Sequence, residues 1–588
     1  MRAFFKYVFA TMVGILLSFV LLLLFIVLIV SALVSSMDSD KVVNVSSNSV
    51  LFLNLDQTIL ERTPNKRFEN VPLIGNSEKS IGFNDIIRAL KEAKTDANIT
   101  CVYLHVTDPK AGKATVKEIR DALVDFKTSK KKIIAYSEIY TQDAYYLASV
   151  ADKIYLNPEG ALEFKGFSSQ VVFFKGALEK LGIEAQIIRV GQFKSAIEPF
   201  ILDKMSEPNR QQVTAYVNGL YDTFLEGISV SRKISKDSLF AIANDLKIRE
   251  PKDALAYKMI DGLKYKDEVI EELKSLSGKT QKEKITTITI NEYADNKKSE
   301  INTSKNRIAV IYANGDINSG EGSDESIGSE RLSRAIRKAR LDDKVKAIVL
   351  RINSPGGSAL ASDVIWREVV LSRKAKPVIA SFGDVAASGG YYIGCAADSI
   401  FVQPNTITGS IGVFGIIPNF QNLLNNKLGI TFDMVKTGQY ADIMTVTRPL
   451  TPGERLIIQN DVNRVYQSFI TKVADGRKKS VSSIDSIAGG RVWVGTDAVR
   501  LGLADRLGSF DDAIASAVKK AKLKDYKIVE YPEKIDPLKE LLDNSKENIE
   551  TYYSKKELGE HYHLYQQVKK SMINAGLQAR LPYQVIVQ

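Results

Sequence analysis

The strongest constraint on the fold is an internal repeat. The segment "NITCVYLHVTDPKAG" from Asn98 aligns with "KVKAIVLRINSPGGS" from Lys344. Further along, "TQDAYYLASVADKIYLNP" aligns with "ASGGYYIGCAADSIFVQP". Position 99 corresponds to 345, 142 to 388 and 152 to 398, so the offset stays at 246 residues. A constant offset with matching apolar positions indicates two copies of one domain, and 588 residues are enough for both.

Each copy alternates short apolar runs with helical stretches. In the second copy, "RIAVIYANG", "KAIVLRI" and "KPVIASF" have the β-branched composition of buried strands, and "ALASDVIWREVVLSRK" has apolar residues at helical spacing. Strands that alternate with helices in this way indicate βαβ units. We therefore expect an α/β fold of tandem duplicated domains with mostly parallel sheets.

The repeat also sets the expected domain boundaries. The first copy is placed at residues 45–290 and the second at residues 307–530. Residues 291–306 between them are polar and lack apolar periodicity, which is typical of a linker. Residues 531–588 have no counterpart in the first copy, and their lysine- and glutamate-rich helical spacing predicts a helical C-terminal extension.

The N-terminus carries a long apolar run. Residues 13–34, "VGILLSFVLLLLFIVLIVSALV", contain no charged side chain. A helix needs about 20 apolar residues to cross a bilayer, whereas a cleaved secretory signal has only about 7–15. Residues 1–37 are therefore predicted to be a retained signal anchor, that is, a transmembrane helix. Because Arg2 and Lys6 precede the run, the N-terminus is expected in the cytoplasm and the rest of the chain outside the inner membrane.

Composition narrows the possible functions. Hydrophobic residues make up 45% of the chain and charged residues 25%, as in ordinary globular proteins. The net charge is +11, but the basic residues are scattered among acidic ones and form no stripe with interleaved aromatics, so nucleic-acid binding is not expected. Two cysteines are too few for a disulfide framework or a four-cysteine zinc site, and we expect neither metal nor cofactor.

A serine in a glycine-rich turn is the candidate nucleophile. In "SFGDVAASGGYYIGCAAD", Ser388 lies where an apolar strand is expected to turn into a helix. Gly389 leaves space for a substrate carbonyl beside the hydroxyl. A second turn, "NSPGGS", ends the preceding strand, and the N–H groups of Gly356 and Gly357 could supply an oxyanion hole. Each turn alone is typical of a structural site, but together they lie at adjacent strand ends, where parallel sheets bind ligands.

The first copy keeps the apolar positions and lacks this glycine chemistry. Gln142 stands where the second copy has Ser388, and "DPKAG" replaces "SPGGS". If the glycines served only the fold, both copies would need them. The difference favours a site in the second copy.

The expected base is a lysine. Of the three histidines, His105 lies on an apolar strand, and His561 and His563 lie in the polar extension. Serine hydrolases can use an unprotonated lysine instead. Lys194, in "RVGQFKSAIEPFILDKMS", sits among small and apolar residues, and the matching position of the second copy is Ala441.

The serine and the lysine thus occur in different copies. A lysine taken alone is normally solvated. Here, however, the first copy lacks the serine and the second copy lacks the lysine, which indicates one composite site where the copies meet. Burial can lower a lysine pKa from about 10.4 by several units, which makes the amine a base near neutral pH. We therefore expect Lys194 to be buried without a carboxylate partner. Ser410, in "TGSIGVFG", either orients this amine or is an ordinary turn serine.

At these residues the chain resembles the signal peptide peptidase A (protease IV) family in its long, duplicated form. The resemblance rests on "NSPGG", "GDVAASGGYY", "TGSIGVFG" and "VGQFKSAIEPF" and covers roughly residues 45 to 530 and the anchor. It implies Clp protease/crotonase-like domains and a membrane-anchored serine endopeptidase in the periplasm that assembles as a bowl-shaped homotetramer. Its substrates would be cleaved signal peptides and other short apolar peptides.

The resemblance also implies a role for each site residue. Ser388 would be the nucleophile, Lys194 the general base and Ser410 the support of the lysine. The N–H groups of Gly356 and Gly389 would stabilise the oxyanion.

Two other functions stay open on the residues alone. A crotonase-like enzyme acting on acyl-CoA also uses glycine-rich oxyanion turns, but it would be cytoplasmic, which the anchor opposes. A non-catalytic membrane scaffold with the same fold would leave Ser388 unreactive toward a fluorophosphonate probe.

Overall fold

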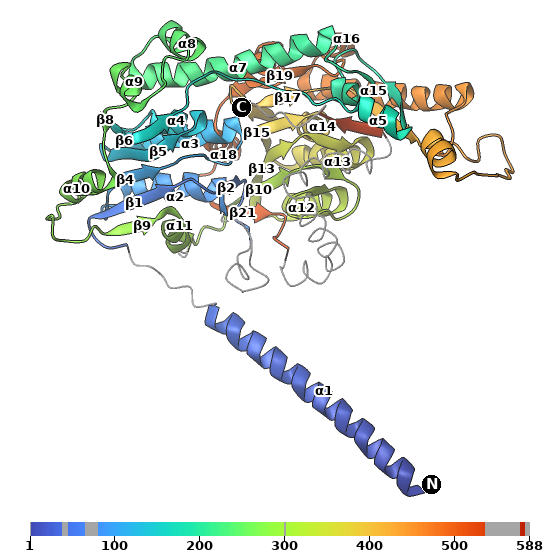
Figure 1. The fold of residues 1–588 in the computed structure, drawn as a ribbon, viewed down its shortest axis with the longest axis horizontal. Helices are drawn as coiled ribbons and strands as arrows, with labels where there is room; N and C mark the ends of the chain where they lie inside the picture. The colour runs from blue at the N-terminus through green and yellow to red at the C-terminus, as the bar shows by residue number, and fades with distance from the viewer. Residues whose placement is uncertain (1, 38–44, 65–79, 299–301, 536–576, 582–588) are drawn as a thin grey trace.

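The computed structural model describes residues 2–37, 45–64, 80–298, 302–535 and 577–581. Within them, two mostly parallel sheets lie side by side with helices packed around them (Figure 1). The first sheet runs in the order β8 (Gly262–Leu263), β6 (Lys153–Leu162), β5 (Lys132–Tyr140), β4 (Ile99–His105), β1 (Ser49–Asn54) and β9 (Thr287–Thr289).

The second sheet repeats this order with strands of the second copy. It runs β20 (Arg506–Leu507), β16 (Ser399–Val402), β15 (Val378–Ala387), β13 (Val345–Ser354), β10 (Arg307–Asn314) and β21 (Lys527–Tyr531), and β17 (Ile407–Gly409) and β19 (Val492–Val494) extend it beside β15. All pairs in the two sheets are parallel except β17 with β19.

Equivalent elements keep the offset seen in the sequence. β4 and β13 begin 246 residues apart, and so do β5 and β15, and β6 and β16. The same offset relates α2 (Phe83–Thr95) to α12 (Ser329–Leu341), and α3 (Lys113–Lys127) to α13 (Ala359–Ala375). The predicted α/β duplication is confirmed.

The elements follow from their apolar patterns. β13 is buried along most of its length, as a strand between two others with helices on both faces must be. α12 buries Leu332, Ala335, Ile336 and Ala339, which is the spacing of one helix face.

The remaining helices and short strands are α4 (Gln142–Ala148), α5 (Lys175–Leu181), α6 (Glu198–Ile201), α8 (Lys236–Asn244), α9 (Pro251–Ala256), α10 (Lys266–Leu276), α15 (Pro452–Arg477), α16 (Val481–Ile487), α17 (Gly495–Leu501), α18 (Phe510–Lys520), β2 (Thr58–Leu60) and β3 (Ser80–Gly82).

Two features join the copies above the strand ends. The long helix α7 (Glu207–Arg232) leaves the first copy and crosses toward β17 and β19 (Figure 1), where Val213 and Leu220 pack against Val494. A third sheet mixes strands of both copies in the order β12 (Ile327–Gly328), β11 (Ile317–Asn318), β14 (Gly356–Ser358), β22 (Leu577–Arg580), β18 (Phe414–Asn419) and β7 (Glu184–Arg189).

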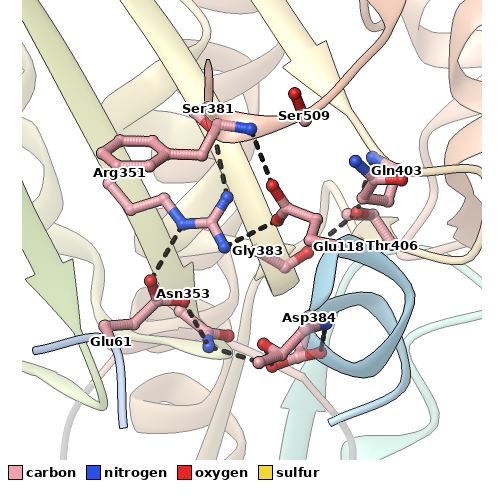
Figure 2. Close-up of polar contacts among 12 residues, drawn as sticks. Glu61, Glu118, Arg351, Asn353, Ser381, Gly383, Asp384, Gln403, Thr406 and Ser509 are labelled. Carbon is pink, nitrogen blue, oxygen red and sulfur yellow. Dashed lines mark hydrogen bonds and ion pairs between the residues drawn. The ribbon is translucent and has the colours of Figure 1, made fainter. Parts of the chain in front are cut away.

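A buried ionic cluster ties the two sheets together. Figure 2 shows the Arg351 guanidinium of the second copy between two carboxylates of the first. Its Nε donates to Glu61 Oε2 and its Nη2 to Glu118 Oε1, each at 2.9 Å. Asn353 donates to Glu61 and to Asp384, which lies four residues before the candidate nucleophile. The cluster fixes how the strand ends of one copy face those of the other.

The structure adds local detail at the predicted linker and at the C-terminal extension. Part of the predicted linker forms helix α11 (Ile290–Lys298), because Tyr293 and Ala294 are buried against the first copy. Within the predicted helical C-terminal extension, residues 577–580 form strand β22. The rest of the extension beyond residue 535 lies outside the described residues.

The predicted anchor is helix α1 (Arg2–Met37), which projects away from the two sheets (Figure 1). Among the described residues it is the one helix long and apolar enough to cross a membrane, and the side chains of its segment Ala3–Phe25 are not buried by protein. These properties fit a membrane anchor.

Candidate active site

Ser388 lies on a strained turn between β15 and α14 (Gly389–Gly394). Its φ of +54° and ψ of −114° are rare for a residue with a side chain. The turn is held at both ends, because Ser388 N–H donates to Gly409 O and Ser388 O accepts from Tyr392 N–H, each at 2.8 Å. Such over-determined strain is typical of functional sites.

Lys194 reaches this serine from the first copy. It follows β7 and precedes a short 3₁₀ turn, Ser195–Ile197. Lys194 Nζ lies 2.9 Å from Ser388 Oγ, 3.0 Å from Ser410 Oγ and 3.1 Å from Ser410 O. The structure therefore brings together the lysine of one copy and the two serines of the other.

Burial changes the protonation of this lysine. Lys194, Ser388 and Ser410 all have 0% relative exposure. Removal from water disfavours the ammonium form and lowers the pKa of Lys194 well below its ordinary value. No carboxylate of the described residues forms an ion pair with Lys194 that would oppose this effect. The amine therefore loses its proton at a lower pH than an exposed lysine, which favours its acting as an acceptor of the Ser388 proton.

One glycine of the second copy makes room for the lysine stem and its neighbour binds the preceding backbone, and sequence reasoning missed both. Gly490 has φ +83°, and a Cβ added to it would lie 2.6 Å from Lys194 Cβ. Gly489 O accepts from Phe193 N–H at 3.1 Å, just before the lysine. The signal available in the sequence was the doublet in "IAGGRVW", which has no special meaning until its contact with Lys194 is known.

Gln212 is a second residue that sequence reasoning missed. It is buried on α7, where its Nε2 donates to Ser195 Oγ at 2.7 Å and to Phe193 O at 3.1 Å. Its Oε1 accepts from Val492 N–H of β19 at 3.2 Å. One amide thus fixes the lysine turn against the second copy.

Ser410 shares the unusual backbone of Ser388. Its φ is +49°, and its N–H donates to Arg491 O at 2.7 Å. Both oxygens of Ser410 lie beside Lys194 Nζ, so this residue limits the positions the amine can take.

Of the three glycines singled out in the sequence, Gly356 and Gly389 lie beside Ser388, whereas Gly357 contacts another strand. Gly356 has φ +99°, and a Cβ on it would come within 2.7 Å of Gly389 N, so these two backbones touch beside Ser388. Gly356 N–H donates to Ser354 Oγ at 3.1 Å. Gly357 packs against another strand, since a Cβ there would lie 2.1 Å from Ile317 O of β11.

In the first copy, the residue equivalent to Ser388 is Gln142, whose side chain binds the backbone. Gln142 Nε2 donates to Gly166 O at 3.0 Å, and its Oε1 accepts from Gly166 N–H at the same distance. His105 lies on β4 of the first sheet with Nδ1 3.1 Å from Tyr136 O, while His561 and His563 lie outside the described residues. In the part of the chain that the structure describes, no cluster of three or more potential ligand side chains could hold a metal ion.

A buried hydroxyl, a neutral amine within hydrogen-bond distance and adjacent backbone N–H groups are the parts that acyl transfer requires. Comparison with known proteins points to the same chemistry. Residues 125–280 and 371–524 match the model of peptidase family S49, and the two matches again begin 246 residues apart.

Individual relatives share most of the chain. It is 40% identical to "Protease 4" of Salmonella typhi over 78% of this chain and 75% of that protein. It is 35% identical to "Serine protease SPPA, chloroplastic" of Arabidopsis thaliana over 74% of this chain and 64% of that protein. The solved structure of a ClpP1 mutant from Listeria monocytogenes matches with a TM-score of 0.24 and 17% identity, over 35% of this chain and 94% of that one.

The family match and the named relatives support a peptidase and not the acyl-CoA enzyme, which the residues alone had left as an alternative. The family match falls once on each copy of the repeat. The chain is a serine peptidase that belongs to peptidase family S49, in a duplicated form.

Proposed function

We propose that Ser388 is the nucleophile and Lys194 the general base of a membrane-anchored endopeptidase. The observation that carries the proposal is the 2.9 Å contact between Lys194 Nζ and Ser388 Oγ in a site closed to water. Ser410 positions the amine through its two oxygens. The two copies, placed at residues 45–290 and 307–530, each supply one half of the dyad.

In the proposed reaction, Ser388 Oγ attacks a peptide carbonyl while its proton passes to Lys194 Nζ. The N–H groups of Gly389 and Gly356 receive the oxyanion, and the Gly356 N–H exchanges its contact with Ser354 Oγ for it. The ammonium then protonates the leaving nitrogen, and water cleaves the acyl-enzyme by the same route in reverse.

The proposed substrates are cleaved signal peptides and other short apolar peptides. Apolar walls from both copies support this choice, because Val213 of α7 and Ile407 and Val492 of the second copy meet near the end of β15. The anchor would hold the site beside the bilayer that such peptides enter. From the basic residues before the apolar run we infer a cytoplasmic N-terminus and a periplasmic body. We also propose assembly as a homotetramer in the inner membrane.

Hydrolysis of a fluorogenic apolar peptide by detergent-solubilised variants tests the dyad. Ser388→Ala and Lys194→Ala are each expected to lose at least about 10³-fold in kcat, as removal of members of other serine dyads and triads does. Lys204→Ala is the matched control, since this lysine is exposed and ten residues away in sequence. Full activity of Lys194→Ala near neutral pH would exclude the lysine as base and leave the serine assignment standing. Full activity of Ser388→Ala would exclude the site.

A further inference from the structure

Helix α3 of the first copy has no capping side chain of its own. The residue before it is Gly112, whereas the equivalent residue before α13 in the second copy is Ser358, 246 positions later. Ser358 Oγ accepts from the N–H of Ala361, the third residue of α13, at 3.3 Å. The first N–H groups of a helix have no partner within the helix and need such an acceptor. The first copy therefore has to find its acceptor elsewhere.

Asp384 of the second copy supplies the missing cap. Its Oδ1 accepts from the N–H of Thr115, the third residue of α3, at 2.8 Å, and its Oδ2 accepts from Thr115 Oγ1 at 2.7 Å. A Cβ added to Gly112 would lie 2.1 Å from Asp384 Cγ, so the glycine leaves the space that this carboxylate fills. The partial positive charge of a helix N-terminus favours a carboxylate there. One side chain thus joins the second copy to a helix of the first.

The same carboxylate lies in a bulge of β15 that leads to the nucleophile. In the pairing of β13 with β15, the single residue Asn353 lies opposite the three residues 383–385. Asn353 Oδ1 accepts from Val385 N–H at 3.1 Å, and Asn353 Nδ2 donates to Asp384 Oδ2 at 3.2 Å (Figure 2). Bulges beside active sites commonly re-aim a side chain. Because Ser388 comes three residues after this bulge, the path of the bulge sets where the serine hydroxyl lies.

The first copy has a carboxylate at the equivalent position, but in a different setting. Glu138 lies 246 positions before Asp384, on β5, and its side chain is exposed. Asp384 instead contacts a helix of the opposite copy. Glu138 is therefore a matched control for the loss of a carboxylate from this strand position.

We propose that Asp384 is a positioning residue, which holds the nucleophile of the second copy where the lysine of the first copy can take its proton. Ser388 and Lys194 come from different copies, so their 2.9 Å contact depends on where the bulge lies relative to the first copy. Asp384 fixes that relation four residues before the serine. The role rests on the proposed function and adds a residue to it. Because the carboxylate contacts α3 and Asn353, its loss should change kcat and not KM.

Peptide hydrolysis and thermal unfolding of the full chain test this role. Asp384→Ala is expected to lower kcat at least about tenfold with KM within twofold, because a displacement of about 1 Å at the reacting groups costs up to about 10²-fold. Its Tm should also fall, by about 2–4 °C, since one helix loses its cap. Asp384→Asn keeps an oxygen for the Thr115 N–H and should stay within about threefold of wild type in kcat. Glu138→Ala should stay within about twofold.

A second substitution separates positioning from simple helix capping. The three atoms nearest to a Cβ on Gly112 all belong to the Asp384 carboxylate, which Asp384→Ala removes. Gly112→Ser in that background can therefore cap α3 as Ser358 caps α13, without a link to the second copy. The double variant should regain Tm and keep the low kcat. Recovery of both would show that Asp384 is only a helix cap and would overturn the proposal, as would a wild-type kcat in Asp384→Ala.

Thr115→Val gives the test from the first copy, even if Asp384→Ala does not fold. It removes the hydroxyl contact with Asp384 Oδ2 and keeps the capped N–H, so kcat should fall about threefold with little change in Tm. An unchanged kcat would overturn the positioning role. Ser388→Ala in the same assay distinguishes the two failures. If Ser388→Ala is inactive and Asp384→Ala fully active, only the positioning role is refuted, whereas full activity of Ser388→Ala refutes the proposed nucleophile and this role with it.

Discussion

Gly490 allows a specific test of how the second copy positions the base. In Gly490→Ala, the new Cβ would lie 2.6 Å from both Lys194 Cβ and Lys194 N, and 2.7 Å from Lys194 Cα. Carbon atoms pack at about 3.5–4.0 Å, so the lysine backbone has to move by about 1 Å. A misplacement of about 1 Å costs up to about 10²-fold in rate, since the Nζ–Oγ contact is lost. We expect kcat/KM to fall about 100-fold.

Gly320→Ala is the matched control. Gly320 has the same φ of +83°, but nothing lies within 4 Å of its added Cβ. Both variants carry the cost of a side chain in the left-handed region, about 1–2 kcal/mol of stability. Only Gly490→Ala also displaces the lysine. The assay is peptide hydrolysis beside thermal unfolding, and a Gly490→Ala enzyme within threefold of Gly320→Ala in kcat/KM would refute the steric reasoning.

Three further changes test the ionic cluster and the lysine support. Arg351→Met leaves the carboxylates of Glu61 and Glu118 buried without their cation. Chemical denaturation should therefore show that the free energy of unfolding falls by about 3–5 kcal/mol. Burial, with two carboxylates sharing one guanidinium, raises the pKa of Glu118 to about 7. The folded chain then keeps a proton that the unfolded chain releases, and wild type should lose stability relative to Glu118→Gln between about pH 4.5 and 7; parallel pH profiles would contradict this. Ser410→Ala removes one hydrogen bond to Lys194 and should lower kcat about tenfold with KM unchanged, whereas unchanged kcat would show that Ser410 is only a turn residue.

The repeat made much of the fold predictable. Strands and helices of the two copies begin 246 residues apart in the structure as in the sequence. The same alignment showed that Ser388 and Lys194 have no counterparts in the opposite copy, which suggested one shared site. This inference needed no three-dimensional information, because it compared the chain with itself.

Residues that act only across the contact between the copies could not be predicted. Gln212 and Val492 are 280 residues apart in sequence, and neither lies in a motif. Gly490 matters because of the lysine stem beside it, and a glycine doublet alone is typical of any tight turn. In the alignment of the two copies Arg351 falls opposite His105 on a strand, and this position does not reveal its two carboxylate partners, which come from other parts of the chain.

Two local elements, helix α11 and strand β22, were not predicted from the sequence, and for a common reason. Helix α11 has nine residues, and its buried side chains Ile290, Tyr293 and Ala294 make a single turn of helical spacing, which is too short to stand out in a polar stretch. Strand β22 has four residues, and its pairing partners lie more than 150 residues earlier. Short elements of this kind form through contacts distant in sequence, and local patterns do not report such contacts.

The pH dependence of Ser388 labelling by a fluorophosphonate tests the neutral lysine most directly. Labelling requires the serine hydroxyl to lose its proton to the base, so its rate follows the fraction of uncharged Lys194. The rate is expected to rise with pH through a midpoint well below 10.5 and then level off, and to fall at least about 10³-fold in Lys194→Ala. A midpoint near 10.5, or labelling of Lys194→Ala at the wild-type rate, would contradict a buried, uncharged lysine acting as the base.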